Sequence, residues 1–317
     1  MSLLFELHRL THFYGQTRAL REIELSVEPG PIGLIGQNGA GKSTLMQILL
    51  GLIRPSQGTA VVLGHEVRSA GLALRGRIGY MPERSALIPG LNGIEYVALA
   101  GELCGMPRKQ ALRRAHEMLS DLNLEDARYR KLEQYSLGMV QRLKLAATLV
   151  HDPDLLLLDE PTSGLDPEGR TAMLRLLESL AARPGKSLLL ATHLLGDIER
   201  VCRSAIVLQQ GQVAFVGSIV QLRLPQPRAF RLSWDGAGTG FVAGLRAQGL
   251  QVNMAEQPQR AQVVVPEGWS TRAFFAEAQK QHVQITGLEP DEEDLQAAYQ
   301  RLIGTVPTGN PQAAGTP

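Results

Sequence analysis

The stretch Gly36-Gln-Asn-Gly-Ala-Gly-Lys-Ser-Thr44 decides the fold, because it fits the pattern G-x-x-x-x-G-K-[ST]. An apolar run typical of a buried strand, Ile32–Ile35, precedes it, and a helical pattern over about Lys42–Leu50 follows and stops at Gly51. Glycines let several backbone N–H groups converge on one point, and the start of a helix adds the positive end of its dipole. The stretch therefore predicts a loop that binds phosphate groups.

Each residue of this phosphate-binding loop has an expected role. Lys42 is expected to reach the β- and γ-phosphates of a nucleotide, and the hydroxyl of Ser43 is expected to bind Mg²⁺. The alternative is a glycine-rich turn with a chance lysine, which the strand before the loop and the helix after it disfavour. The residues predicted to contact the nucleotide here are Gly36, Gln37, Asn38, Gly39, Ala40, Gly41, Lys42, Ser43 and Thr44.

Two acidic residues, Asp159 and Glu160, follow a second apolar run, Leu155–Leu158. Asp159, at the end of a buried strand, suits a ligand of Mg²⁺ beside the phosphate-binding loop. Glu160, one residue further on, is expected to point elsewhere and to act as general base for an attacking water. Without the loop, a solvated strand end would explain the two acids equally well. Because the loop is present, the sequence favours the catalytic interpretation.

The chain up to about residue 222 alternates short apolar runs with helical patterns, which predicts an α/β domain over residues 1–222. Between about 88 and 150 the pattern is helical throughout and predicts an inserted helical subdomain. Asn92 followed by Glu95 is typical of a capping box at a helix start. The apolar residues of one predicted helix face in this subdomain are Ala111, Ala115, Met118, Leu119 and Leu122.

Residues 223–303 follow a Pro-rich segment, Pro225–Arg228, that has the composition of a linker. The predicted elements come in the order βαββαβ, which predicts a small α+β domain of the ferredoxin-like kind. Asp291–Leu302 has the pattern of a final amphipathic helix with acidic residues at its start. The tail, residues 304–317, is rich in Pro, Gly and Thr and is expected to be disordered.

The composition excludes some classes of function. The chain has 317 residues, of which 44% are apolar and 20% are charged, the balance of an ordinary globular protein. Its net charge is +1 and it has no long run of Lys or Arg, so nucleic-acid binding is not expected. The two cysteines, Cys104 and Cys202, lie far apart in the sequence and lack the spacing of metal ligands, so we expect two reduced thiols. No apolar run approaches the ~20 residues that span a bilayer.

Further stretches, together with those above, resemble the ATP-binding subunits of ABC transporters over about residues 3–220. Tyr135-Ser-Leu-Gly-Met139 is similar to the signature motif of that family, Ser163-Gly-Leu-Asp166 to its D-loop, and His193 to its switch histidine. Tyr14 is similar to the aromatic residue that stacks on adenine. A phosphate-binding loop alone would indicate only an NTPase, whereas these elements in this order are highly specific.

The resemblance implies a P-loop NTPase core of the ABC type, which hydrolyses ATP with Mg²⁺ in a head-to-tail dimer, most simply of identical chains. Each ATP would lie between the phosphate-binding loop of one chain and Ser136 and Gly138 of the other. Asp166 is also assigned to the nucleotide site. His193 would contact the γ-phosphate and help to place the water near Glu160. The implied partner is a multi-span membrane permease, which would hold the chain at the cytoplasmic face of the plasma membrane.

Two positions depart from the commonest form of the family. The Q-loop usually carries Gln, but Ile78-Gly-Tyr-Met-Pro-Glu83 ends in Glu. Because a carboxylate can still ligate Mg²⁺, Glu83 joins Ser43 and Asp159 as a predicted metal ligand. The signature carries Leu137 and Met139 where Gly and Gln are usual. These forms are similar to a bacterial subgroup that exports drugs, antibiotics or polysaccharides, and this resemblance implies export.

Three classes of function are open to such a core. The first is an ATPase that drives a membrane exporter. The second is a non-transport ABC ATPase acting on nucleic acid or ribosomes, whose members generally carry two ATPase cores or long coiled-coil insertions. The third, a P-loop kinase, has no use for a signature motif or a D-loop. The single core and near-neutral charge favour the first class, with the second as the alternative.

Overall fold

The computed structural model describes residues 3–84, 87–223, 229–255, 257, 259–266, 268–290 and 294–305. The chain divides into two compact units, one extending to Ile219 and one spanning Val220–Gly304, and each is described by itself. The predicted linker Pro225–Arg228 and the predicted tail beyond Thr305 lie outside the described residues.

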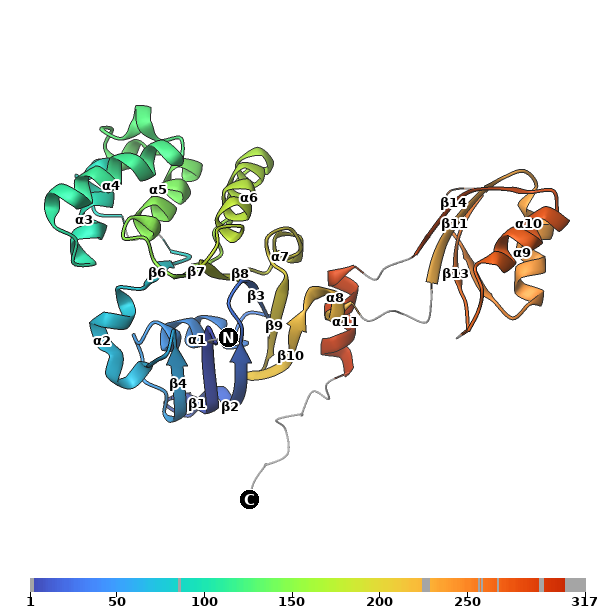
Figure 1. Cartoon of the computed structure of the whole chain (residues 1–317), viewed down its shortest axis with the longest axis horizontal. Helices are drawn as coiled ribbons and strands as arrows, with labels where there is room; N and C mark the ends of the chain where they lie inside the picture. Colours follow the sequence, from blue (N-terminus) through green and yellow to red (C-terminus); the bar gives the residue numbers. More distant parts are fainter. Residues whose placement is uncertain are drawn as a thin grey trace, which may run out of the picture. The chain divides into compact units, whose positions relative to one another are not determined.

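The first unit is built around a six-stranded sheet in which five neighbouring strands run parallel (Figure 1). Its central strands are continuous apolar runs, and two of them are buried at every residue, as expected when both faces of a parallel sheet are covered. In spatial order the strands are β10 (Gln212–Ser218), β9 (Ser204–Gln209), β3 (Pro31–Ile35), β8 (Ser187–Ala191), β7 (Leu155–Asp159) and β6 (Ile78–Met81).

A four-stranded antiparallel sheet shares the core of this unit. In spatial order its strands are β2 (Thr17–Val27), β1 (Phe5–Tyr14), β4 (Gln57–Val62) and β5 (His65–Glu66). One hydrophobic cluster joins it to helix α1 (Lys42–Leu49) and to the parallel sheet, with Leu7, Leu45 and Leu157 each fully buried. This packing holds the end of β1, and with it Tyr14, next to the helix that follows the phosphate-binding loop.

Three helices form the inserted helical part of the unit: α3 (Gly93–Leu103), α4 (Arg108–Asp121) and α5 (Leu137–Leu149), drawn in green in Figure 1. The predicted capping box is confirmed, since Glu95 N donates to Asn92 Oδ1 at 3.0 Å and Asn92 N donates to Glu95 Oε2 at 2.9 Å. Every residue of the predicted apolar face is buried. Within the described part of the chain, no helix is long and apolar enough to cross a membrane.

The remaining helical elements of the first unit connect its strands. They are α2 (Val67–Arg75), two 3₁₀ turns at Glu125–Ala127 and Leu132–Gln134, α6 (Pro167–Ala181) and α7 (Leu195–Val201), and α8 (Ile219–Leu222) leads into the second unit.

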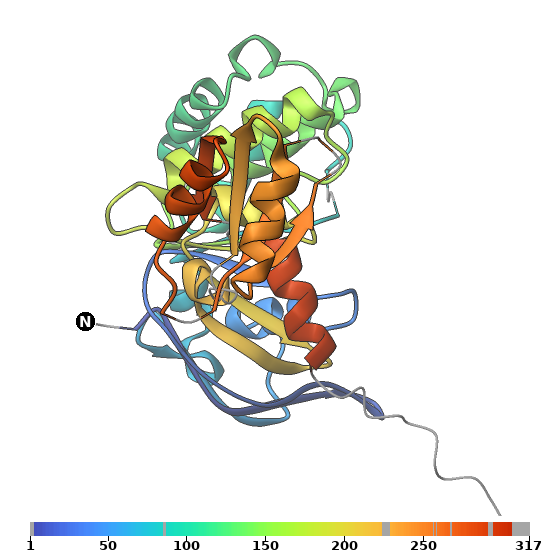
Figure 2. The same cartoon turned by 90° about the vertical axis from the view of Figure 1, so that its right-hand side faces the viewer.

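The second unit has the element order β11 (Ala229–Asp235), α9 (Gly238–Ala247), β12 (Gln251–Met254), β13 (Arg260–Val264), α10 (Arg272–Lys280) and β14 (Gln284–Pro290). Its sheet has the order β12-β13-β11-β14 and is antiparallel throughout, which is the ferredoxin-like arrangement. Both helices lie on one face of the sheet; Figure 2 shows them in front of the strands. Trp234, Phe241 and Phe274 fill the core between helices and sheet.

A last helix, α11 (Leu295–Thr305), closes the described chain. The sequence predicts this helix over Asp291–Leu302, but the described Asp294 lies before its first residue, and the helix continues through Gly304 and Thr305, which were predicted to belong to the tail. Residues 291–293 lie outside the described part. The predicted fold class, an α/β nucleotide-binding core with a helical insertion and a small α+β domain, is confirmed.

Candidate nucleotide-binding site

The phosphate-binding loop and the residues predicted for metal binding and catalysis lie where four parallel strands end. The phosphate-binding loop follows β3, Glu83 follows β6, Asp159 ends β7 and His193 follows β8. Ligands of open α/β sheets bind at these carboxyl ends. A cavity of about 800 Å³ opens there, lined by Tyr14, Thr17, Arg18, Ala19, Gly36, Gln37, Asn38, Gly39, Gly41, Lys42, Ser43, Thr44, Glu83, Asp159, Glu160 and His193.

The loop after β3 requires glycine at two positions. A Cβ on Gly36 would lie 2.7 Å from the carbonyl oxygen of Leu208, and Gly41 has a φ of 105°, which side chains rarely adopt. Gly41 is also the N-cap of α1, and among the described residues no side chain caps this helix. The first N–H groups of α1 are therefore available to an anion. Ala40 is 5% exposed and does not line the cavity.

Lys42 places an ammonium group in this loop. Its Nζ donates to the carbonyl oxygens of Gly36 at 2.6 Å and Gln37 at 3.3 Å. Burial lowers the pKa of Lys42, and the carboxylates of Glu160, Asp159 and Glu83 act in the opposite direction. Without a nucleotide, the ammonium group of Lys42 is thus bonded to loop carbonyl oxygens. At the cavity wall, a phosphate group could accept hydrogen bonds from the same ammonium group.

Tyr14 gives the cavity an aromatic side chain. It is 47% exposed, its hydroxyl donates to Gln47 Oε1 at 3.2 Å, and its ring meets that of His12 edge-on with centroids 4.7 Å apart. Gln47 lies on α1, so this hydrogen bond fixes Tyr14 relative to the phosphate-binding loop. An exposed ring held in this way can stack on a flat base.

Three carboxylates, of Glu83, Asp159 and Glu160, line the cavity together. Asp159 is 6% exposed, and burial followed by repulsion from Glu83 and Glu160 raises its pKa to about 6. A divalent cation would relieve this repulsion. The hydroxyl of Ser43 and the carboxylates of Asp159 and Glu83 are the hard oxygen donors that Mg²⁺ prefers, so the residues present fit the predicted metal.

Removing the buried charge of Asp159 should stabilise the nucleotide-free protein. The pKa of Asp159 is about 6 in the folded protein, above its ordinary value of 3.8. The ionised side chain therefore lowers the free energy of unfolding, and this loss grows as the pH rises from 3.8 to about 6. At lower pH, where Asp159 is protonated in both the folded and the unfolded state, the loss disappears. Asp159→Asn should therefore raise the Tm at about pH 7.5, by about 2–4 °C for each kcal/mol relieved. Calorimetry at pH values down to about 4 should show the gain shrinking. An equal or lower Tm at about pH 7.5 would contradict the electrostatic argument.

Glu160 and His193 touch each other at the same end of the sheet. The Nδ1 atom and the backbone N–H of His193 each lie 2.8 Å from Glu160 Oε1, and Thr192 Oγ1 donates to Glu160 Oε2 at 2.9 Å. The Glu160 side chain is 10% exposed, whereas that of His193 is 61% exposed. These contacts orient a carboxylate toward the cavity, with the histidine as its exposed neighbour.

The backbone of Glu160 has a φ of 48°, in the left-handed region. A residue with a side chain pays of order 1–3 kcal/mol for such a conformation, and strain of this kind concentrates at functional sites. The N–H of Glu160 donates to the carbonyl oxygen of Ala191 at 2.8 Å, which ties the residue after β7 to the end of the neighbouring parallel strand β8. The conformation lets Asp159 and Glu160, adjacent in sequence, line one cavity.

Ser136, Gly138 and Asp166 do not line the cavity around Lys42. Ser136 is the N-cap of α5, where its Oγ accepts a hydrogen bond from Met139 N at 3.3 Å. Asp166 is the N-cap of α6, where its Oδ1 accepts from the N–H of Gly169 at 3.2 Å. Within one chain, the predicted residues therefore form one group at the cavity and a second group at two helix N-termini.

Sequence reasoning missed a buried carboxylate behind the cavity. Asp197, on α7, is 1% exposed and accepts from Thr162 Oγ1 at 2.6 Å and from Arg170 Nε and Nη2 at 2.8 and 2.6 Å. It thereby ties the loop after Glu160 to α6 and to the helix after His193. No sequence signal separates Asp197 from a solvated residue of an amphipathic helix. Arg18 and Thr192 were missed as well.

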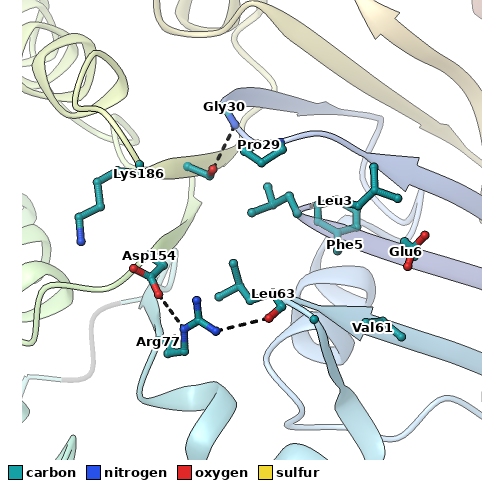
Figure 3. Close-up of a pocket in the computed structure, with 14 residues that line it drawn as sticks. Leu3, Phe5, Glu6, Pro29, Gly30, Val61, Leu63, Arg77, Asp154 and Lys186 are labelled. Carbon is teal, nitrogen blue, oxygen red and sulfur yellow. Dashed lines mark hydrogen bonds and ion pairs between the residues drawn. The ribbon is translucent and has the colours of Figure 1, made fainter. Parts of the chain in front are cut away.

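A second cavity in this unit, of about 730 Å³, lies at the opposite ends of the parallel strands (Figure 3). Leu3, Phe5 and Leu63 form an apolar wall, and Arg77 Nε donates to Asp154 Oδ2 at 2.7 Å. Asp154 directly precedes β7, so this cavity is at the amino ends of the strands. Because ligand sites of such sheets lie at the carboxyl ends, the first cavity is the candidate nucleotide site.

The phosphate-binding loop, the acidic strand end and the parallel sheet define a P-loop nucleotide-binding domain. The family described as "ABC transporter" matches residues 20–163. The daunorubicin/doxorubicin resistance ATP-binding protein DrrA of Streptomyces peucetius is 32% identical over 300 residues, which are 93% of this chain and 91% of DrrA. The Nod factor export ATP-binding protein I of Cupriavidus metallidurans is 35% identical over 213 residues, 67% of this chain and 70% of that protein. The chain belongs to the ATP-binding proteins of ABC transporters.

Solved structures agree with this assignment. A structure of the ATP-binding subunit of an ABC transporter matches 69% of this chain and 92% of its own, with a TM-score of 0.63 and 30% identity. A dimeric ATP-binding cassette in a post-hydrolysis state, bound to ADP and Pi, matches 68% of this chain and 98% of its own, with a TM-score of 0.62 and 27% identity. The family resemblance inferred from the sequence is confirmed.

Proposed function

We propose that this chain hydrolyses ATP as the motor subunit of an ABC exporter, and that two copies clasp each ATP between them, head to tail. One observation carries the proposal: Lys42 and Ser136 belong to separate groups within the chain. The N-terminus of α5 can then offer its N–H groups to a γ-phosphate held by another copy. A post-hydrolysis cassette of similar fold is dimeric, which supports this arrangement.

Each residue at the cavity has a task in the proposed reaction. The N–H groups of the loop and Lys42 hold the phosphates, and Tyr14 stacks on the base. Ser43, Asp159 and Glu83 would hold Mg²⁺, which would offset the charge of the phosphate oxygens.

Glu160 takes a proton from the attacking water onto its carboxylate. Thr192 and the N–H of His193 keep that carboxylate oriented, and they leave further lone pairs on its oxygens for the water. The imidazole of His193 contacts Glu160 and is exposed, which supports the proposed role of joining the carboxylate to a phosphate oxygen.

The proposed partner is a permease with several membrane spans, which would hold this chain at the cytoplasmic face of the plasma membrane. Export is supported by relatives that are named for drug resistance and Nod factor export. Isolation of the chain together with such a permease would support this proposal. Salt-dependent binding to nucleic acid would favour the alternative class.

Ser136→Arg tests the shared site. The bulk of arginine should block the surface that receives the other copy's phosphate, so ATP should no longer produce dimers in light scattering, while ATP binding to the single chain should stay within about twofold. The matched control is Ser136→Ala, which removes the N-cap at a cost of about 1 kcal/mol but adds no bulk. Normal ATP-dependent dimers of Ser136→Arg would refute the head-to-tail site.

A further inference from the structure

Lys144 is a buried lysine that the proposed reaction does not use. It lies on α5 and is 4% exposed, and its Nζ donates to the backbone carbonyl oxygen of Glu83 at 2.9 Å. Within the described part of the chain, this neutral oxygen is the one hydrogen-bond partner of an ammonium group that carries three donors. A buried ammonium group is costly unless opposite charge lies close by.

The opposite charge comes from the carboxylates at the cavity. Burial lowers the pKa of Lys144, and the carboxylates of Glu83 and Asp159 act against this effect. In return, Lys144 and Lys42 lower the pKa of Asp159, while Glu83 and Glu160 raise it. Three carboxylates thus face two ammonium groups. With a neutral Gln at position 83, two carboxylates would face the same two ammonium groups.

Lys144 also connects the two groups of predicted site residues. It lies two helical turns, about 12 Å, after Ser136 on α5. One turn further on the same face, Thr148 Oγ1 donates to the carbonyl oxygen of Lys144 at 2.8 Å and also lies 3.3 Å from the carbonyl oxygen of Tyr80. Tyr80 belongs to β6, and Glu83 follows this strand. Lys144 and Thr148 therefore hold α5 against the strand and loop that present Glu83.

We propose that Lys144 is a positioning residue of the metal site: its ammonium group fixes the Glu83 loop against α5 and balances the charge that Glu83 adds. The proposal rests on the function proposed above, because the metal site belongs to that function. It predicts that the effects of removing the charges at positions 83 and 144 are coupled. Removing the lysine alone should lower stability and activity, and removing both charges should lower them much less.

The thermal test uses the full chain without nucleotide or Mg²⁺. Lys144→Met should lower the Tm by roughly 5 °C, because a buried partner of the carboxylates is lost. Adding Glu83→Gln should restore at least half of that loss, whereas Glu83→Gln alone should not raise the Tm. The control is Thr148→Val, which removes the neighbouring contact of α5 without changing charge. Glu83→Gln should not rescue Thr148→Val.

The second readout is hydrolysis of ATP with Mg²⁺. Lys144→Met should lower kcat about 10-fold with KM within about twofold, and Glu83→Gln should recover part of kcat in the double variant only. Equal shifts of the Tm by Glu83→Gln in both backgrounds would overturn the proposal, whatever the activity. A native chain that ignores ATP would instead refute the proposed function, and the thermal test, which needs no nucleotide, would still decide the role of Lys144.

Discussion

Glu160→Gln should leave ATP binding intact and slow ATP hydrolysis by about 10²-fold or more, the scale of a lost general base. Glutamine has nearly the same size, and its amide oxygen can still accept the hydrogen bond from the N–H of His193. It cannot take a proton from water. Single-turnover hydrolysis gives the rate, and titration with a fluorescent ATP analogue gives the dissociation constant.

The matched control for this prediction is Glu178→Gln, on α6 in the same unit. Glu178 pairs with Arg200 at the surface and lies outside the cavity. That variant should hydrolyse ATP at the native rate. If Glu160→Gln also turned over normally, Glu160 would not be the base, even with its carboxylate directed at the cavity.

Lys42→Ala should weaken ATP binding by about 10–100-fold, the range expected when a hydrogen bond between an ammonium group and a phosphate is lost. The glycines at positions 36 and 41 should still shape the loop backbone in this variant, although the hydrogen bonds from Lys42 Nζ to the carbonyl oxygens of Gly36 and Gln37 are lost. Equilibrium titration with ATP measures the effect, and circular dichroism checks that the variant folds.

Lys186→Ala is the control for the lysine at the loop. Lys186 is also partly buried, and its Nζ bonds to the carbonyl oxygen of Asp152 at 3.0 Å. It lines the cavity at the amino ends of the strands, away from the proposed nucleotide site (Figure 3). ATP affinity should not change in this variant. Unchanged affinity in Lys42→Ala would refute the phosphate-binding role of Lys42.

Local sequence patterns predicted the parts of the fold that depend on neighbouring residues. The apolar run before Asp159 coincides with β7, and the predicted capping box of Asn92 and Glu95 lies at the start of α3. The order βαββαβ predicted the strand order of the second unit, because crossover helices and a hairpin allow few arrangements. These features follow from periodicity, caps and turns.

Contacts between distant segments could not be predicted in this way. Lys144 lies 61 residues from Glu83 in sequence, and α5 is buried on several faces, so no polar stripe marks which side of the helix Lys144 occupies. Asp197 has the same difficulty, since it meets its partners Thr162 and Arg170 only in the folded chain. A buried charge and a solvated one look alike in a single sequence.

The N-caps Ser136 and Asp166 have a consequence for turnover. Ser136, which is proposed to face another copy's ATP, and Asp166, which the family resemblance assigns to the nucleotide site, each have a hydrogen-bond partner in their own chain. When two copies separate after hydrolysis, the side chains of Ser136 and Asp166 therefore keep a hydrogen-bond partner within their own chain. Dissociation and re-formation of the dimer then leave no side chain at these two N-caps without a hydrogen bond. This suits an ATPase whose dimer must open in every catalytic cycle.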